Sequence, residues 1–216
     1  MHPADKLKKF LFTRIKRNIT IPYFHASFII VLMLLVSCGT NEELKNKFDS
    51  DISSLTGAYT NRDWDKVTGM IYPEFFKAVP KQTVIKSLAM LDSLGMKRIF
   101  SFKGIDKING PVIYGGNEYY RVFYKTVITV SVSKPENVNL KELTDEFNED
   151  YGENNVKFQP DGIKFTINAL QSVIAVSAAG AGNWKYLELN NEHAFDIVAS
   201  VLPAAVMKAL GGKNSL

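Results

Sequence analysis

The amino-acid sequence predicts an α+β fold, in which helices pack on a mostly antiparallel sheet and a further helix follows at the C-terminus. Three observations lead to this prediction. Apolar residues recur every three or four positions in much of residues 44–94, which is the period of a helix. After Gly95 the period changes to two, which is typical of strands, and residues 195–210 again suit a helix. Helices grouped before strands favour an antiparallel sheet with helices on one face.

Three helices are expected before the sheet. The first covers residues 44–59. The second covers residues 64–71, and Asp63 suits its N-cap because an aspartate side chain accepts a hydrogen bond from a free N–H group of the first turn. The third covers residues 82–94. Gly95 suits the position just after it, since glycine readily adopts the left-handed backbone that ends many helices.

Residues 118–133 form the longest strand of the predicted sheet. Their even positions are mostly apolar or aromatic, whereas the odd positions include Arg121 and Lys125, which is typical of a sheet with one side in solvent. Period-two patterns also predict strands at residues 98–103, 163–167, 170–177 and 184–189, and a short strand or loop segment at 112–114. An acidic helix at 140–151 lies in an insert at about 136–155, and Pro203 is expected to kink or split the last helix.

The first forty residues are basic and then apolar. The apolar run at residues 26–36 is shorter than the roughly 20 residues that a membrane span needs, but it suits the hydrophobic region of a signal peptide. The run ends in Leu35-Val36-Ser37-Cys38, which resembles the lipobox of bacterial lipoproteins. The basic residues before it are Lys6, Lys8, Lys9, Arg14, Lys16 and Arg17.

The lipobox resemblance implies a signal peptide at residues 1–37, lipid on Cys38, and anchoring to a membrane. A polar tether at 38–46 and a single domain at 47–216 would follow. Gly39 is not aspartate, so the resemblance points to the outer membrane of the bacterial cell envelope. The alternative is an N-terminal anchor helix that contains a cysteine by chance.

The charge of the chain depends on this leader. The whole sequence has a formal net charge of +4, but without residues 1–38 it keeps 20 basic and 21 acidic side chains. The basic surface expected of a nucleic-acid-binding protein is therefore absent, and nucleic acid is not an expected partner. Cys38 is the only cysteine and His193 the only histidine after the leader, so we expect no metal site and no cofactor.

Two short motifs resemble the NTF2-like (cystatin-like) superfamily. One is Ala58-Tyr59-Thr60-Asn61-Arg62-Asp63-Trp64-Asp65-Lys66-Val67 followed by Ile71-Tyr72-Pro73, and the other is Asn183-Trp184-Lys185-Tyr186. The resemblance implies a cone formed by helices on a curved sheet. The insert at 136–155 and the C-terminal helix depart from that pattern. Another α+β lipoprotein domain is the alternative.

The residues that carry catalysis in such cones are not evident here. No acid is expected on the apolar face of a strand, and His193 is interpreted as a surface residue at a helix start rather than a general base. Aromatic side chains with polar atoms suit a binding pocket. The candidate pocket residues are Trp64, Tyr72, Tyr120, Tyr124 and Trp184, and ordinary core packing is the alternative.

The sequence therefore predicts a membrane-anchored envelope lipoprotein with a non-catalytic domain. That domain would bind a small apolar ligand or an envelope protein, and a homodimer is a further expectation left open. The alternative is an NTF2-like isomerase or dehydratase that acts inside the cone.

Overall fold

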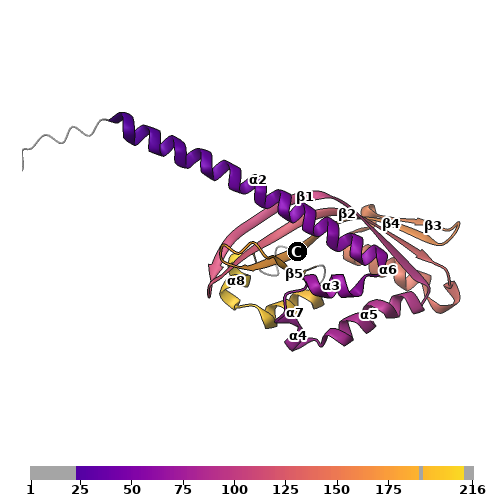
Figure 1. Cartoon of the computed structure of the whole chain (residues 1–216). Coiled ribbons are helices and arrows are strands. Elements are labelled where there is room, and N and C mark those ends of the chain that lie inside the picture. The colour runs from indigo at the N-terminus through magenta and orange to yellow at the C-terminus, as the bar shows by residue number, and fades with distance from the viewer. Residues whose placement is uncertain (1–22, 190–191, 212–216) are drawn as a thin grey trace, which may run out of the picture. The chain divides into compact units, whose positions relative to one another are not determined.

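The computed structural model describes residues 23–189 and 192–211, and side chains from residue 42 onward except those of residues 192 and 193. The chain divides into two compact units, Met1–Leu44 and Lys45–Leu216. Residues 1–22 of the expected signal peptide lie outside the described residues, and so do the side chains of Cys38 and His193. Of the first unit the structure describes the helical residues 23–44, which belong to α2, Tyr23–Asn61 (Figure 1).

The helix expected at residues 44–59 therefore begins earlier, and α2 includes the segment expected as a polar tether. Glu42, Glu43 and Lys45 in that segment are good helix formers, so their polarity does not end the helix. Among the described residues, no helix combines the length and the apolar character that crossing a bilayer requires.

Three shorter helices follow α2: α3, Trp64–Met70; α4, Phe75–Ala78; and α5, Lys81–Ser93. The predicted N-cap is confirmed, because the Asp63 side chain accepts a hydrogen bond of 3.0 Å from the backbone N–H of Lys66. The predicted end of α5 is also confirmed, since Gly95 has φ of +80°. The short helix α4 was not expected.

The described strands form one antiparallel sheet, which confirms the α+β class. Its strands are β1, Met96–Tyr114; β2, Asn117–Val132; β3, Val156–Gln159; β4, Lys164–Ala178; and β5, Lys185–Glu188. Their order is β1-β2-β4-β3, and β5 also pairs with β4. The segments expected at 98–103 and 112–114 are parts of the single strand β1. Those expected at 163–167 and 170–177 belong to β4, except for residue 163, which precedes it. In β1, shifts of register at Phe102/Gly104, Ile105/Lys107 and Asn109/Val112 interrupt the period of two, which hid its length.

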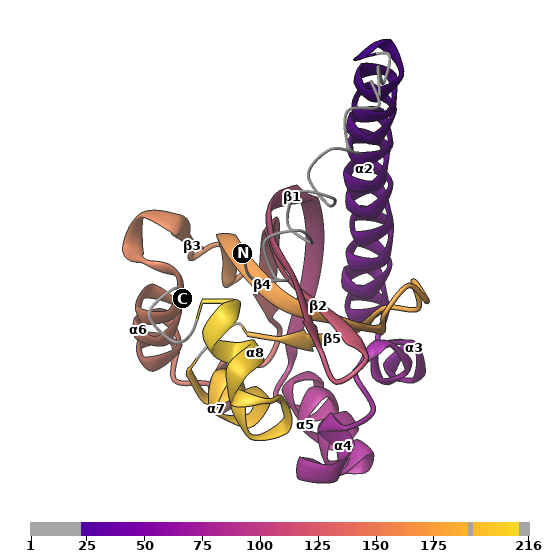
Figure 2. The ribbon, with the colours of Figure 1, turned by 90° about the vertical axis from the view of Figure 1, so that its left-hand side faces the viewer.

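The later helices agree closely with the prediction. The acidic helix α6, Leu140–Tyr151, lies in the expected insert between the short 3₁₀ helices Pro135–Asn137 and Glu153–Asn155. Leu143 of α6 is buried against β2 and β4. The last segment forms α7, Glu192–Val201, and α8, Ala204–Ala209, and Pro203 splits the two as expected (Figure 2).

The two faces of the sheet are covered by different helices. On one face, Phe48 of α2 packs on the ring of Tyr120, with ring centroids 5.7 Å apart. On the other face, Tyr119 and Ile174 belong to a buried cluster with residues of α7 and α8. The expectation that helices cover only one face is therefore wrong at this end of the sheet.

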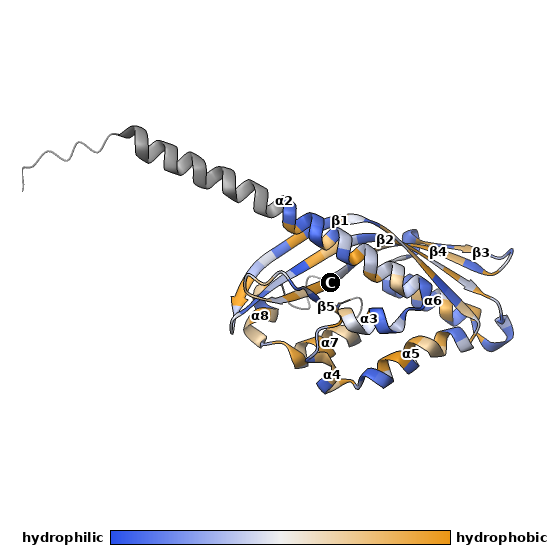
Figure 3. Ribbon diagram, viewed as in Figure 1, coloured by the Kyte–Doolittle hydropathy of each residue, from blue (hydrophilic) through white to orange (hydrophobic). Residues whose placement is uncertain are grey.

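Arg121 shows the consequence of this second layer. The side chain was expected in solvent but is only 1 % exposed. Its Nη1 donates a hydrogen bond of 2.7 Å to the backbone oxygen of Gly211, just after α8. Farther along the same face, Lys125 is exposed as expected, and Figure 3 shows polar and apolar residues alternating along the long strands.

Candidate ligand-binding site

A polar cavity of about 250 Å³ lies on the face of the sheet that carries the even positions of β2. Tyr124 of β2 and Gln171 of β4 are directly opposite each other in the ladder, so both side chains are on the same face. Arg98 of β1 and Tyr151 of α6 also line the cavity. Its remaining polar lining residues are Thr56, Tyr59 and Glu188.

An apolar cavity of about 400 Å³ lies beside the polar one. Its lining includes Met70, Ile71, Phe75, Val84, Leu88, Leu187 and Ile197. Val84 and Leu88 belong to α5, a helix without any fully buried residue. The helix α4, which supplies Phe75, also has no fully buried residue. Since burial is what holds a helix in position, α4 and α5 are loosely packed walls of this cavity.

The two cavities share part of their lining. The residues that line both are Leu55, Tyr59, Leu88, Glu188 and Ala194. A molecule that occupies both cavities would pass beside the carboxyl group of Glu188. The combined site has a polar end and an apolar end, which is the usual composition of a small-molecule site.

The hydroxyl of Tyr59 and the carboxyl group of Glu188 interact in the wall that both cavities share. Burial raises the pKa of Glu188 above its ordinary value of 4.5, while the hydroxyl of Tyr59 and the charge of Arg98 act in the opposite direction. Burial, followed by the charge of Glu188, raises the pKa of Tyr59 well above 10. The tyrosine therefore stays protonated near neutral pH and remains a donor.

Three polar side chains of the polar cavity have no hydrogen bond or ion pair within the part of the chain that the structure describes: Arg98, Tyr124 and Gln171. Tyr124 is 2 % exposed and Gln171 is 7 % exposed. Buried polar groups in proteins are nearly always hydrogen-bonded, so these groups suit a bound molecule or water. The guanidinium carbon of Arg98 lies 5.8 Å from the ring centroid of Phe100 and leaves its N–H groups available.

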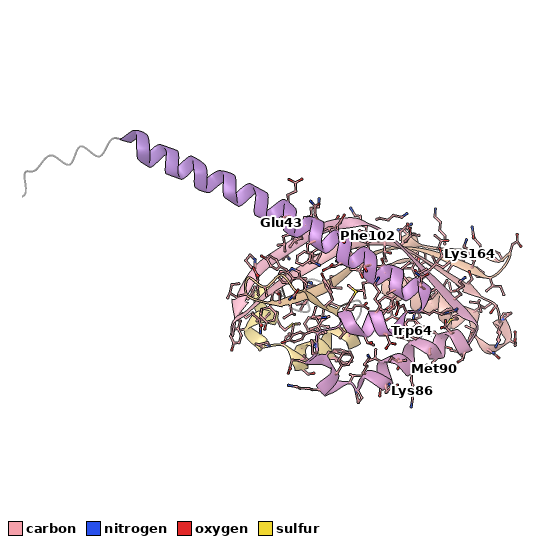
Figure 4. All side chains as sticks on the ribbon, in the orientation of Figure 1. Glu43, Trp64, Lys86, Met90, Phe102 and Lys164 are labelled. Carbon is pink, nitrogen blue, oxygen red and sulfur yellow. The ribbon has the colours of Figure 1, made fainter. Side chains whose placement is uncertain are left out.

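The structure separates the five aromatic residues suggested by the sequence. Tyr124 lines the polar cavity. Tyr120 and Trp184 pack in the core, with ring centroids 5.5 Å apart. Trp64, labelled in Figure 4, packs edge-on to Tyr59 at the start of α3. Tyr72 packs against the cluster beneath α7 and α8. These four do not line either cavity.

Sequence reasoning missed the polar residues at the centre of the site. The expectation that no acid lies on an apolar strand face is wrong, because Glu188 is two residues from the buried Tyr186 and shares its face. An acid in the pattern Trp184-Lys185-Tyr186-Leu187-Glu188-Leu189 was the available signal. Arg98 gave a weaker signal, since its position opposite Val130 depends on the bulged register of β1.

Within the described residues, no three His, Cys, Asp or Glu side chains are grouped so that they could hold a metal ion. No protein-family model, no curated protein and no solved structure matches this chain.

Proposed function

We propose that this chain is a lipid-anchored lipoprotein of a bacterial cell envelope, and that its folded body binds a small amphipathic molecule. The observation that carries the binding proposal is the pair of adjoining cavities, one polar and one apolar, that share Glu188 and Tyr59. A ligand with a polar head and an apolar body matches both parts at once.

The anchor rests on the sequence. Leu35-Val36-Ser37-Cys38 follows a basic and then an apolar segment, as in lipoprotein precursors. A diacylglycerol on Cys38 together with an N-acyl chain would hold the body stably at a membrane, since two or more chains are needed for stable anchoring. Gly39 after the cysteine favours the outer membrane.

The NTF2-like cone is part of the same proposal. Its support is the bulged strand β1 and the burial of Phe48 and Ile52 of α2 against the sheet. Bulges bend a strand and increase its twist, which favours a curved sheet with a hollow face.

Metabolic labelling with an alkyne fatty acid tests the anchor. The wild-type chain should incorporate the label and sediment with membranes, whereas Cys38→Ser should not be labelled, because serine cannot form the thioether. Ser37→Ala is the matched control, since a small residue before the cysteine is retained. Equal labelling of the wild type and Cys38→Ser would reject the anchor.

Binding of N-phenylnaphthylamine, a neutral dye that fluoresces in apolar surroundings, tests the cavity. The full chain in lipid nanodiscs should bind the dye saturably above empty nanodiscs. Leu88→Trp should abolish this binding by filling space in both cavities. Met90→Trp is the control, because Met90 is 58 % exposed on the same helix (Figure 4).

Val84→Trp, which fills only the apolar cavity, provides a second test should Leu88→Trp fail to fold, as judged by circular dichroism. Equal dye binding by the wild type, Val84→Trp and Met90→Trp would reject binding in the cavity.

A second candidate is an isomerase or dehydratase that uses the same cavity. It is favoured by Glu188, a carboxyl group whose pKa is raised by burial and which lies in the cavity wall with Tyr59. Such a group suits a general base that removes a proton next to a carbonyl group. The test is deuterium exchange at the α-carbon of 2-tetralone in D₂O, followed by NMR. Exchange that is faster with the wild type than with Glu188→Gln would support this candidate, and equal rates would reject it for this ketone.

A further inference from the structure

We propose that the ligand is an amphiphile with an anionic carboxylate head, bound by Arg98 with help from Tyr124 and Gln171, and with its apolar body beside α5. This inference rests on the proposed binding function and specifies its ligand class. Two observations support it. Some polar side chains of the polar cavity have no hydrogen-bond partner within the described residues, and the apolar cavity begins at a wall that it shares with the polar one.

The unpartnered groups of the polar cavity supply several N–H and O–H donors. Arg98 presents the N–H groups of a guanidinium, whose fork geometry matches the two oxygens of a carboxylate. Tyr124 contributes a hydroxyl and Gln171 an amide, and the ladder brings these two onto adjacent strands at directly opposite positions. Arg98, Tyr124 and Gln171 all line the one cavity of about 250 Å³.

The burial of these groups makes a bound acceptor energetically important. Tyr124 and Gln171 are at least nine-tenths buried, and burial raises the pKa of Tyr124 well above 10, so its hydroxyl stays a donor. Donors that face a cavity in such surroundings gain more from a charged acceptor than from a neutral one. A carboxylate meets this requirement with few atoms.

A negative charge on Glu188 would repel the carboxylate of the ligand, but three features of the site reduce this repulsion. Glu188 lies in the wall shared by both cavities, where the hydroxyl of Tyr59 interacts with it. Arg98 is close enough to act on Glu188 electrostatically, so its positive charge serves both groups. Burial also favours the neutral form of Glu188.

The apolar cavity determines the rest of the ligand. It begins at the same shared wall and is lined by apolar side chains of α3, α5 and α7, among them Met70, Leu88 and Ile197. A short alkyl chain attached to a head at Arg98 would extend along this wall. Medium-chain monocarboxylates therefore match the whole site in both shape and polarity.

Three probes with the same eight-carbon chain test the head group: octanoate, octanol and octylamine. Each is titrated against the full chain in nanodiscs with N-phenylnaphthylamine bound, with empty nanodiscs as reference. We expect octanoate to displace the dye at a concentration about tenfold lower than octanol, since one charge-assisted hydrogen bond accounts for a factor of that order. Octylamine is expected to be the weakest of the three.

Arg98→Met should remove the preference for octanoate over octanol while octanol binding remains. Lys97→Met is the matched control, because Lys97 is the next residue of β1, is exposed, and pairs with Ser131 on the other face of the sheet. Tyr124→Phe, which removes only a hydroxyl, provides a second test if Arg98→Met does not fold. It should weaken the binding of octanoate severalfold and leave the binding of octanol unchanged.

Equal displacement by octanoate and octanol, or stronger displacement by octylamine, would overturn the anionic head and leave the cavity function standing. If the dye does not bind, or if binding is unaffected by Leu88→Trp and by Val84→Trp, the proposed function itself fails. The two failures are therefore distinguishable.

Discussion

The hydroxyl of Tyr186 on β5 donates a hydrogen bond of 2.6 Å to Oδ2 of Asp51 on α2, 135 residues earlier in the chain. This bond joins the last strand of the sheet to the helix that supplies Leu55 and Tyr59 to the cavities. Because Tyr186 is buried, its hydroxyl needs a hydrogen-bond partner within the protein, and a buried hydroxyl without one destabilises the fold. Besides its ladder with β4, β5, which carries Glu188, is thus also linked to α2.

Tyr186→Phe should lower the free energy of unfolding by about 2 kcal/mol, the usual value for a hydrogen bond to a charged group. Urea denaturation followed by tryptophan fluorescence measures the change. Lys47→Ala is the control, because Lys47 binds the same carboxylate from a position that is 48 % exposed, and should cost less than about 0.5 kcal/mol. Equal losses for both variants would contradict the role of the tyrosine.

Arg121 should contribute strongly to the docking of the C-terminal helices. Its Nη1 bonds to the oxygen of Gly211, and its guanidinium lies over the ring of Phe123, 4.8 Å from the centroid. We expect Arg121→Met to cost about 2 kcal/mol of stability and to speed hydrogen exchange in α8.

Lys125→Met is the matched control for Arg121→Met. Lys125 is four residues along β2, on the same face, with its side chain 65 % exposed. It should change stability by less than about 0.5 kcal/mol and leave exchange in α8 unchanged. Protection of α8 that is unaltered in Arg121→Met would show that the arginine does not hold this helix.

Glu188 should make stability depend on pH. Its pKa in the folded chain is raised above the ordinary value of 4.5, chiefly by burial, so between these two values the folded state binds more protons than the unfolded state. Stability therefore falls as the pH rises through this window, and the loss is complete above the raised pKa. Glu188→Gln cannot ionise and should gain stability relative to the wild type over the same interval.

Urea denaturation of the wild type and Glu188→Gln at a series of pH values from about 4 to about 8 checks this prediction. The difference in the free energy of unfolding between the two proteins should be constant at pH values below the window. Within the window it should change in favour of the glutamine variant. A difference that does not change with pH would mean that the carboxyl group titrates as it does in the unfolded chain.

Substitution of Gly95 by alanine should lower the stability of the fold by more than its positive φ alone would cause. A Cβ added at Gly95 would lie 2.8 Å from Cβ of Lys134. Gly162 has nearly the same φ, +82° against +80°, and an added Cβ there meets nothing within 4 Å. Gly162→Ala should cost about 1 kcal/mol for the left-handed backbone, and Gly95→Ala more. Thermal unfolding of both variants gives the comparison; equal losses would show that Lys134 moves aside without cost.

The local features of the fold were predictable from the sequence. The cap at Asp63, the end of α5 at Gly95 and the helix Leu140–Tyr151 all agree with the structure. Strand lengths were less predictable, because the bulges of β1 interrupt the alternation that marks a strand. The site was the least predictable part: Tyr124 lies at the cavity as suggested, whereas Glu188, Arg98 and Gln171 were not anticipated.

The sequence by itself determined the features that depend on neighbours a few residues away, such as caps, helix ends and the break at Pro203, because the groups that interact there are close along the chain. Only the tertiary structure decided which strand faces are covered and which side chains meet in a cavity. Arg121 is buried because Gly211, 90 residues later, lies over it. Glu188 becomes part of a site because α2 brings Tyr59 to it. A strand pattern records which side chains share a face, but the distant segment that covers that face is determined by packing.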